Sequence, residues 1–143
     1  MAKKFKTEIV TPEKVVFSEE IESLVIPAER GYLGVLAGHA PLLCTLRPGA
    51  ITIRGDKGEQ HFSTSGGFME VTPAKAVLLT ESAEEAGGID LQRAEEAKKR
   101  AQERLASADK AVDKDRARAA LERADNRIKV AQKFKKYPPA WRK

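Results

Sequence analysis

The first part of the chain alternates between hydrophobic and polar residues with the period of two that is typical of half-buried strands. Short alternating segments recur up to residue 80, separated by segments that contain glycine or proline. The alternation predicts strands at residues 5–10, 14–17, 21–26, 51–54, 60–63, 68–71 and 76–80. Pro27 is expected to end the third of them, because proline donates no backbone hydrogen bond. Many short strands with this punctuation are typical of an all-β sandwich or flattened barrel.

Beyond residue 88 the hydrophobic residues recur at alternating steps of three and four, which places them on one face of a helix. Two series follow one another: Ala94, Ala97, Ala101, Leu105 and Ala108, then Ala117, Leu121, Ala124, Ile128 and Ala131. They predict two helices that form an antiparallel hairpin, and Asp109 and Asp113 are alternative N-caps of the second helix. One register pairs a small residue with a large one three times: Ala94 with Ile128, Ala101 with Leu121, and Leu105 with Ala117.

Charge also divides the chain at Gly87-Gly88. The net charge is +5, but residues 1–88 carry 9 basic and 12 acidic residues, whereas residues 89–143 carry 17 and 9. We expect a β-sandwich domain at residues 1–86, a flexible Gly-Gly joint at 87–88, a helical hairpin at 89–134 and an extended tail at 135–143. The hairpin faces are mostly alanine and bury little apolar surface, so the hairpin needs a second surface to dock on. The tail either pins the hairpin to the sandwich, extends a contact with another protein, or frays.

Several classes of protein are excluded. No segment approaches the roughly 18–20 apolar residues of a membrane-spanning helix, no apolar signal peptide opens the chain, and Cys44 has no second cysteine to pair with. His39, Cys44 and His61 lack the spacing of metal ligands. The segment 63–67 has neither the lysine nor the following helix of a phosphate-binding loop. We therefore expect no enzyme and no metal site.

Four segments carry a more specific pattern. They are Val10-Thr-Pro-Glu-Lys-Val-Val-Phe17, Gly31-Tyr-Leu-Gly-Val-Leu-Ala-Gly-His-Ala-Pro-Leu-Leu43, Pro48-Gly-Ala-Ile-Thr-Ile53 and Ser65-Gly-Gly-Phe-Met-Glu-Val71. In order and spacing the chain resembles the epsilon subunit of bacterial F-type ATP synthases across residues 5–133. The resemblance implies about ten strands in a sandwich, followed by the helical hairpin.

For function, the resemblance implies a non-catalytic rotor subunit of the central stalk, which couples the gamma subunit to the c-ring in proton-driven ATP synthesis. Residues near 31–43 and 65–71 would contact gamma and the c-ring. The extended hairpin would inhibit ATP hydrolysis by contacting the catalytic beta (and alpha) subunits. Such a subunit is peripheral, lies on the cytoplasmic face of the bacterial cell membrane, and reaches the membrane only through the complex.

The resemblance also implies a nucleotide site. Ile89-Asp90-Leu-Gln-Arg93-Ala94 resembles the ATP-binding motif of some epsilon subunits, whose further contacts correspond to Glu84, Arg100, Arg123 and Arg127. The predicted register opposes these arginines in two pairs, Arg93 with Arg127 and Arg100 with Arg123. Guanidinium groups bind phosphate oxygens well, so the compact hairpin would bind a regulatory ATP, although no cofactor is required. Asp90 would then contact adenine or simply cap the first helix.

Two other interpretations of the basic hairpin stay open. The arginines are also consistent with solvated helix faces that carry ion pairs such as Glu96–Arg100 and Asp125–Lys129, each worth about 0.3–0.5 kcal/mol. Alternatively, a free-standing basic hairpin would be a nucleic-acid-binding module that contacts phosphates. Under the epsilon-subunit interpretation, nucleic acid is not a partner.

Overall fold

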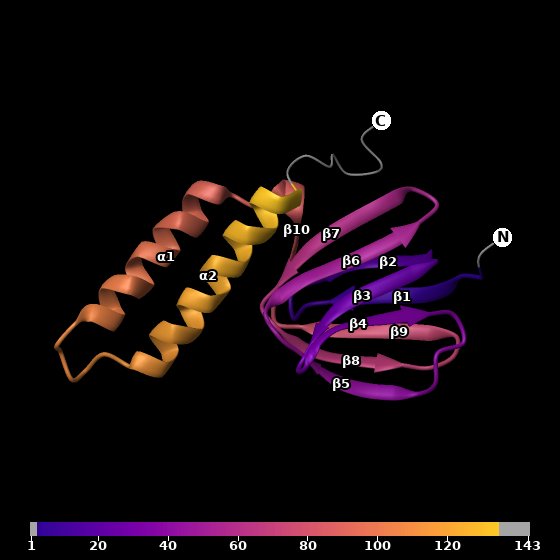
Figure 1. Ribbon diagram of the computed structural model, residues 1–143, viewed down its shortest axis with the longest axis horizontal. Coiled ribbons are helices and arrows are strands. Elements are labelled where there is room, and N and C mark those ends of the chain that lie inside the picture. Colours follow the sequence, from indigo (N-terminus) through magenta and orange to yellow (C-terminus); the bar gives the residue numbers. More distant parts are fainter. Residues whose placement is uncertain (1–2, 135–143) are drawn as a thin grey trace.

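The computed structural model describes residues 3–134, which form a ten-stranded sandwich followed by two helices (Figure 1). The strands are β1 (Phe5–Val10), β2 (Val15–Ile21), β3 (Ser23–Ala28), β4 (Gly31–Leu36), β5 (Leu42–Leu46), β6 (Gly49–Gly55), β7 (Gly58–Thr64), β8 (Gly67–Val71), β9 (Lys75–Thr80) and β10 (Ala83–Glu85). A 3-10 turn (Ala86–Gly88) leads to α1 (Leu91–Ala106) and α2 (Lys114–Phe134). The predicted fold class is confirmed.

The strands form one sheet that curls into a nearly closed barrel. Its order is β10-β7-β6-β3-β5-β8-β9-β1-β2, with β4 paired to β3, and the β1–β9 pair is parallel. The core lies inside it and is built from the alternate hydrophobic residues of the strands, among them Ile9, Leu24, Ile26, Ile51 and Leu78, all 0% exposed. Phe17 of β2 meets Phe62 of β7 edge to face, so the two ends of the sheet approach each other.

Each of the seven predicted strand segments overlaps an observed strand, and β4, β5 and β10 are additional. The expectation that Pro27 ends the third strand is wrong, because β3 continues to Ala28. The strand does not depend on a backbone N–H donor at position 27, and the Pro27 carbonyl accepts a hydrogen bond from the Arg47 backbone N–H at 2.9 Å. A proline is tolerated in a strand where its missing N–H has no ladder partner to serve.

The two helices form the expected antiparallel hairpin in the expected register. Ala94 and Ala101 of α1 and Ala117 and Ala124 of α2 are buried, as the spacing predicted. Lys98 and Asp125 form an ion pair of 2.9 Å across the hairpin, so Asp125 does not rely on Lys129 of its own helix.

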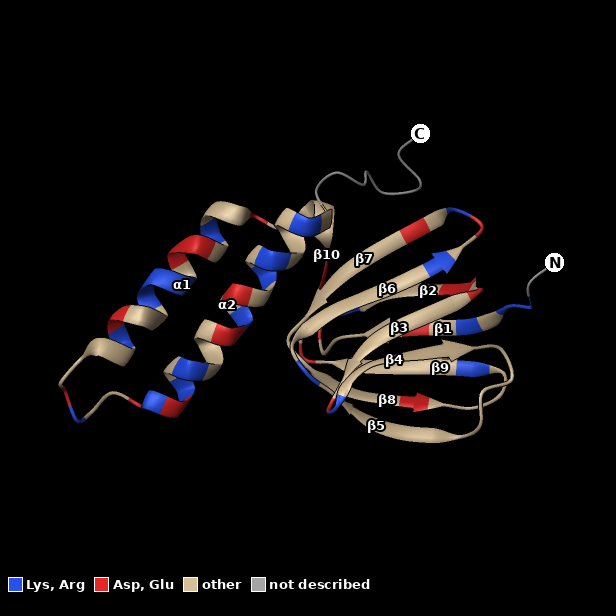
Figure 2. Ribbon diagram, in the orientation of Figure 1, with Lys and Arg blue, Asp and Glu red and all other residues tan. Residues whose placement is uncertain are grey.

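The helix ends settle the choice of N-cap. Asp113 accepts a hydrogen bond from the Arg116 backbone N–H at 3.1 Å and caps α2, whereas Asp109 accepts one from Ala111 within the connecting loop. Basic and acidic residues are interspersed along both helices (Figure 2). Within residues 3–134, neither helix has an apolar stretch long enough to cross a membrane.

Candidate functional site: a cleft between hairpin and sandwich

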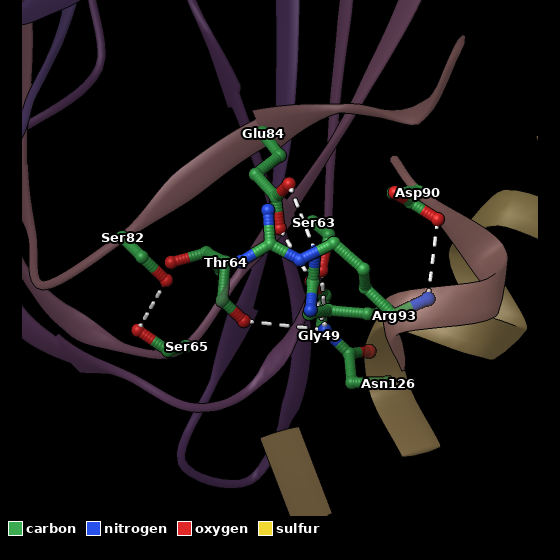
Figure 3. A network of polar contacts seen from close by, with 10 residues as sticks. Gly49, Ser63, Thr64, Ser65, Ser82, Glu84, Asp90, Arg93 and Asn126 are labelled. Carbon is green, nitrogen blue, oxygen red and sulfur yellow. Dashed lines mark hydrogen bonds and ion pairs between the residues drawn. The ribbon is translucent and has the colours of Figure 1, made fainter. Parts of the chain in front are cut away.

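Asn126 is the central contact between α2 and the sandwich. Its side-chain nitrogen lies 3.0 Å from the Gly49 carbonyl, 3.1 Å from the Ser63 hydroxyl and 3.2 Å from the Thr64 carbonyl (Figure 3). One amide group, with two N–H donors, therefore serves three acceptors on β6 and β7. The side chain is half-buried, so water replaces these contacts only in part when the helix moves.

An ion pair fixes the next residue of α2. The Arg127 guanidinium donates to both carboxylate oxygens of Glu84 on β10, with Nε–Oε1 at 2.6 Å and Nη2–Oε2 at 3.2 Å. The two side chains are 28% and 37% exposed, respectively. A bidentate arginine–carboxylate pair is among the stronger polar contacts in proteins, and this one ties α2 to the last strand of the sandwich.

The end of α2 packs on β7 through aromatic stacking. The Phe134 ring lies parallel to the buried His61 ring, with centroids 3.6 Å apart and an angle of 10°. Thr52 Oγ1 lies 3.0 Å from His61 Nδ1, and Glu59 lies 3.4 Å from Nε2. Burial lowers the pKa of His61; Lys133 lowers it further, and Glu59 opposes both. The docked helix therefore favours a neutral imidazole.

A cleft of about 310 Å³ lies among these contacts; we call it the hairpin cleft. Its lining consists of hydroxyl residues from the sandwich, small residues from both helices, one acid and two arginines. These residues are Ser63, Thr64, Ser65, Ser82, Glu84, Ala97, Ala120, Arg123, Ala124 and Arg127. The volume is at the lower end of the range of small-molecule sites, about 300–1,000 Å³. Guanidinium and hydroxyl donors together suit an anionic ligand that also carries hydroxyl groups.

The structure brings together three of the eight residues expected to contact a nucleotide: Glu84, Arg123 and Arg127 line the hairpin cleft. The other two arginines, Arg93 and Arg100, are exposed on α1 and do not line it, although Ala97 between them does. The reason is the position of the helices: α2 lies between α1 and the sandwich (Figure 1).

The three remaining residues of the motif have structural positions. Asp90 accepts a hydrogen bond from the Arg93 backbone N–H at 3.1 Å and so caps α1, which is one of the two roles considered for it (Figure 3). Ile89 is half-buried, and Ala94 is fully buried on the hydrophobic face of α1.

Sequence reasoning missed Asn126 and the hydroxyl residues of the cleft. Asparagine has a low helix propensity, so its place inside a 21-residue helix was an available signal for a tertiary contact. The hydroxyls gave no comparable signal, because serine and threonine are ordinary residues at strand ends.

A second candidate surface is apolar and lies on the outside of the sandwich. The strand register places Phe68 beside Leu79, Leu79 beside Val10, and Val10 beside Val15, in one row across β8, β9, β1 and β2. We call this the apolar row; Phe68, Leu79 and Val15 are 55%, 56% and 58% exposed. Further exposed hydrophobic residues are Tyr32, Leu36 and Leu43. Contiguous exposed apolar surface of this kind marks a contact with another protein.

Comparison with known proteins gives matches over nearly the whole chain. Residues 4–86 match the family model described as ATP synthase, Delta/Epsilon chain, beta-sandwich domain, and residues 88–132 match the long alpha-helix domain of the same family. The chain is 49% identical over 134 residues to the ATP synthase epsilon chain of Desulforamulus reducens, covering 92% of this chain and all of that one. It is 44% identical to that of Natranaerobius thermophilus, covering 91% and 94%.

Solved structures agree on the fold. A chain in the cryo-EM structure of the Euglena gracilis mitochondrial ATP synthase, OSCP/F1/c-ring, superposes with a TM-score of 0.77 at 24% identity, covering 90% of this chain and 81% of that one.

Proposed function

Because the chain belongs to the Delta/Epsilon chain family of ATP synthases, we propose that it couples the gamma subunit to the c-ring as a non-catalytic part of the central stalk. The apolar row is the observation that carries this proposal. A subunit that transmits torque needs a stable interface on its rigid domain, and exposed apolar area supplies that stability. Of the six large exposed hydrophobic residues in the described part of the chain, four fall in the two segments expected to contact gamma and the c-ring: Phe68 of the apolar row, and Tyr32, Leu36 and Leu43 outside it.

Membership of this family supports the interpretation of the basic hairpin as part of a stalk subunit rather than as a nucleic-acid-binding module. In the assembled enzyme we place the chain at the cytoplasmic face of the bacterial cell membrane, where it is peripheral and touches the membrane through the complex. Its partners there are gamma, the c-ring, and the beta (and alpha) subunits.

We further propose that the hairpin inhibits ATP hydrolysis when it leaves the sandwich. Its attachment supports a two-position element: α2 is held mainly by Asn126, the Arg127–Glu84 pair and the Phe134–His61 stack. Most residues buried between the helices are alanines, which contribute little burial energy. A few polar contacts can break together, and the basic residues of the released helices would then meet the beta and alpha subunits.

The hairpin cleft supports the proposal that ATP stabilises the compact position. Arg123, Arg127, Ser63 and Ser82 all line the cleft; we infer that the two guanidinium groups bind phosphate oxygens and that the two hydroxyls bind the sugar. Arg127 is already paired with Glu84, so a phosphate must compete with a carboxylate, which favours weak binding suited to millimolar ATP. A ligand that extends from the cleft past Ala97 would reach Arg93 and Arg100 on the neighbouring turns of α1.

Binding to the stalk tests the main proposal. The chain is added to a complex of gamma and the c-ring, and its retention is measured by pull-down with purified components. Phe68→Glu, which puts a charge at one end of the apolar row, should abolish retention. Ala119→Glu, an exposed position on α2, is the matched control and should bind like the unmodified chain. Equal retention of both variants would refute the apolar row as the stalk interface.

A further inference from the structure

The turn between the two helices lacks the glycine that commonly ends a helix. Residues 107–113 contain neither glycine nor proline, and within residues 3–134 no residue other than glycine has a positive φ. Ser107, which follows α1, is extended, with φ −65° and ψ 136°. A glycine in the left-handed conformation usually lets backbone N–H groups bond the last carbonyls of a helix. The carbonyls at the end of α1 therefore need another donor.

Lys114, the first residue of α2, supplies that donor. Its Nζ donates to the Arg104 carbonyl at 3.1 Å and to the Leu105 carbonyl at 2.9 Å. It also donates to the Ser107 carbonyl. An ammonium group has three N–H donors, so all of them are used. A cation at the start of a helix opposes the dipole of that helix, whereas a cation at the end of a helix is favourable. The position of Lys114 is therefore explained by α1 and not by its own helix.

The other contacts at this end of the hairpin are weak. Ala101 of α1 and Ala117 of α2 are the buried helix residues nearest the turn, and alanine contributes little burial energy. Arg104 and Arg116 line a depression of about 370 Å³ beside the turn, so two more positive charges lie on the same end of the hairpin, and like charges repel. The contacts of Lys114 with the three carbonyls are therefore the main polar attraction described between the end of α1 and the start of α2.

The sandwich holds the opposite part of α2. Asn126 and Arg127 bond to β6, β7 and β10, and Phe134 stacks on β7. The tail predicted at residues 135–143 lies outside the described residues. At a rise of 1.5 Å per residue, Lys114 lies about 18 Å along the helix from Asn126, and Figure 1 shows the turn at the end of the hairpin away from β10. Two separate sets of contacts therefore hold α2, one on α1 and one on the sandwich.

We propose that Lys114 is a latch that makes separation of the two helices a step distinct from release of α2 from the sandwich. With the latch closed, α1 and α2 leave the sandwich together as a hairpin. With the latch broken, the helices part at the turn even while the other end of α2 stays docked. This inference rests on the proposed release of the hairpin and adds a second control to it. The faces that α1 and α2 turn toward each other become available to the catalytic subunits only after Lys114 has released α1.

Pulsed electron paramagnetic resonance on the full chain measures the two steps separately. In a Cys44→Ser background, spin labels at Glu103→Cys on α1 and Ala119→Cys on α2, both exposed positions near the turn, report the distance between the helices. We call these labels the turn pair. Labels at Glu81→Cys and Gln132→Cys, also exposed, report the distance between the sandwich and the end of α2, and we call them the docking pair.

The latch predicts opposite effects of two substitutions. Lys114→Met keeps the length of the side chain but removes its charge and donors, so it should raise the population of a longer turn-pair distance several-fold and leave the docking pair unchanged. Asn126→Ala should lengthen the docking-pair distance and leave the turn pair unchanged. Lys110→Met, which removes an exposed charge from the same turn, is the matched control for Lys114→Met and should change neither distance.

Three results overturn the proposal: an unchanged turn-pair distance in Lys114→Met, an equal change in Lys110→Met, and separation of the helices in Asn126→Ala as complete as in Lys114→Met. Failure of the proposed release shows separately, as a docking-pair distance that is the same in Asn126→Ala as in the unmodified chain. If circular dichroism shows that Lys114→Met has lost its helices, NMR of the side-chain ammonium groups in the unmodified chain replaces it. The Lys114 ammonium protons should exchange with water several-fold more slowly than those of Lys110, and equal exchange would contradict the latch.

Discussion

Replacing Asn126 by alanine should loosen the hairpin without loosening the sandwich. The amide nitrogen contacts the Gly49 carbonyl, the Ser63 hydroxyl and the Thr64 carbonyl at 3.0–3.2 Å. A hydrogen bond contributes about 0.5–1.5 kcal/mol net, and a buried acceptor left without a partner costs about 1–3 kcal/mol. Because water reaches the half-buried site in part, we expect the docked hairpin to lose about 2 kcal/mol relative to the undocked one.

A loss of that size raises the population of the undocked hairpin about 30-fold. Native-state hydrogen exchange measures it directly, because each amide reports the free energy of the opening that exposes it. Amides of α2 should exchange faster in Asn126→Ala, and those of β1 and β9 should keep their rates. Gln132→Ala, an exposed amide side chain on the same helix, is the control and should change neither. Equal acceleration in α2 and in the sandwich would contradict this prediction, since it would mean that Asn126 stabilises the whole fold.

Three further predictions concern single residues of the cleft and the sandwich. Calorimetric titration should show at least about tenfold weaker ATP binding for Arg123→Ala, because this change removes a charge-assisted contact worth about 1.5–3 kcal/mol. Arg118→Ala, outside the hairpin cleft, should bind ATP normally, and an equal loss of affinity in both variants would contradict ATP binding in the cleft. Because burial lowers the pKa of His61, the His61 imidazole on β7 binds a proton more readily below about pH 6.5 when the hairpin is undocked than when it is docked. Exchange of α2 amides should therefore speed up as the pH falls from about 7.5 to 5.5, after correction for the intrinsic exchange rate, and His61→Asn should remove that dependence. Gly67→Ala should destabilise the sandwich by at least about 2 kcal/mol in urea denaturation, because the φ of Gly67 is +149° and an added Cβ would lie 2.0 Å from the Leu79 carbonyl oxygen. Gly34→Ala should cost less than about 1 kcal/mol, because no atom lies within 4 Å of a Cβ added there. Similar losses of stability in the two variants would show that backbone strain at Gly67 is not the cause.

The helices were predictable because their pattern is redundant. Ten residues repeat one spacing, and the predicted register pairs a small residue with a large one three times; the Lys98–Asp125 ion pair fits that register. The strands were less predictable where the pattern is short. β10 has three half-buried residues, and β4 carries a glycine at both Gly31 and Gly34, so neither shows enough alternation to be recognised.

The candidate site was predictable only in part, because the register of a hairpin does not say which of its sides faces the sandwich. Glu84, Arg123 and Arg127 meet because α2 packs directly on β7 and β10 packs beside it. The arginines of α1 were expected beside them, but α1 lies on the far side of α2 (Figure 1). The roles of Asn126 and His61 depend on contacts between residues more than sixty positions apart, which no local pattern encodes.

We propose that the hairpin inhibits ATP hydrolysis only after it leaves the sandwich. The most direct test locks it in place: in a Cys44→Ser background, Ser63→Cys and Asn126→Cys, whose polar side-chain atoms lie 3.1 Å apart, are oxidised to a disulfide and the chain is assembled with the catalytic subunits, gamma and the c-ring. The rate of ATP hydrolysis is then measured before and after reduction. We expect uninhibited hydrolysis by the locked enzyme and inhibition that appears on reduction. Equal inhibition in both states would contradict it.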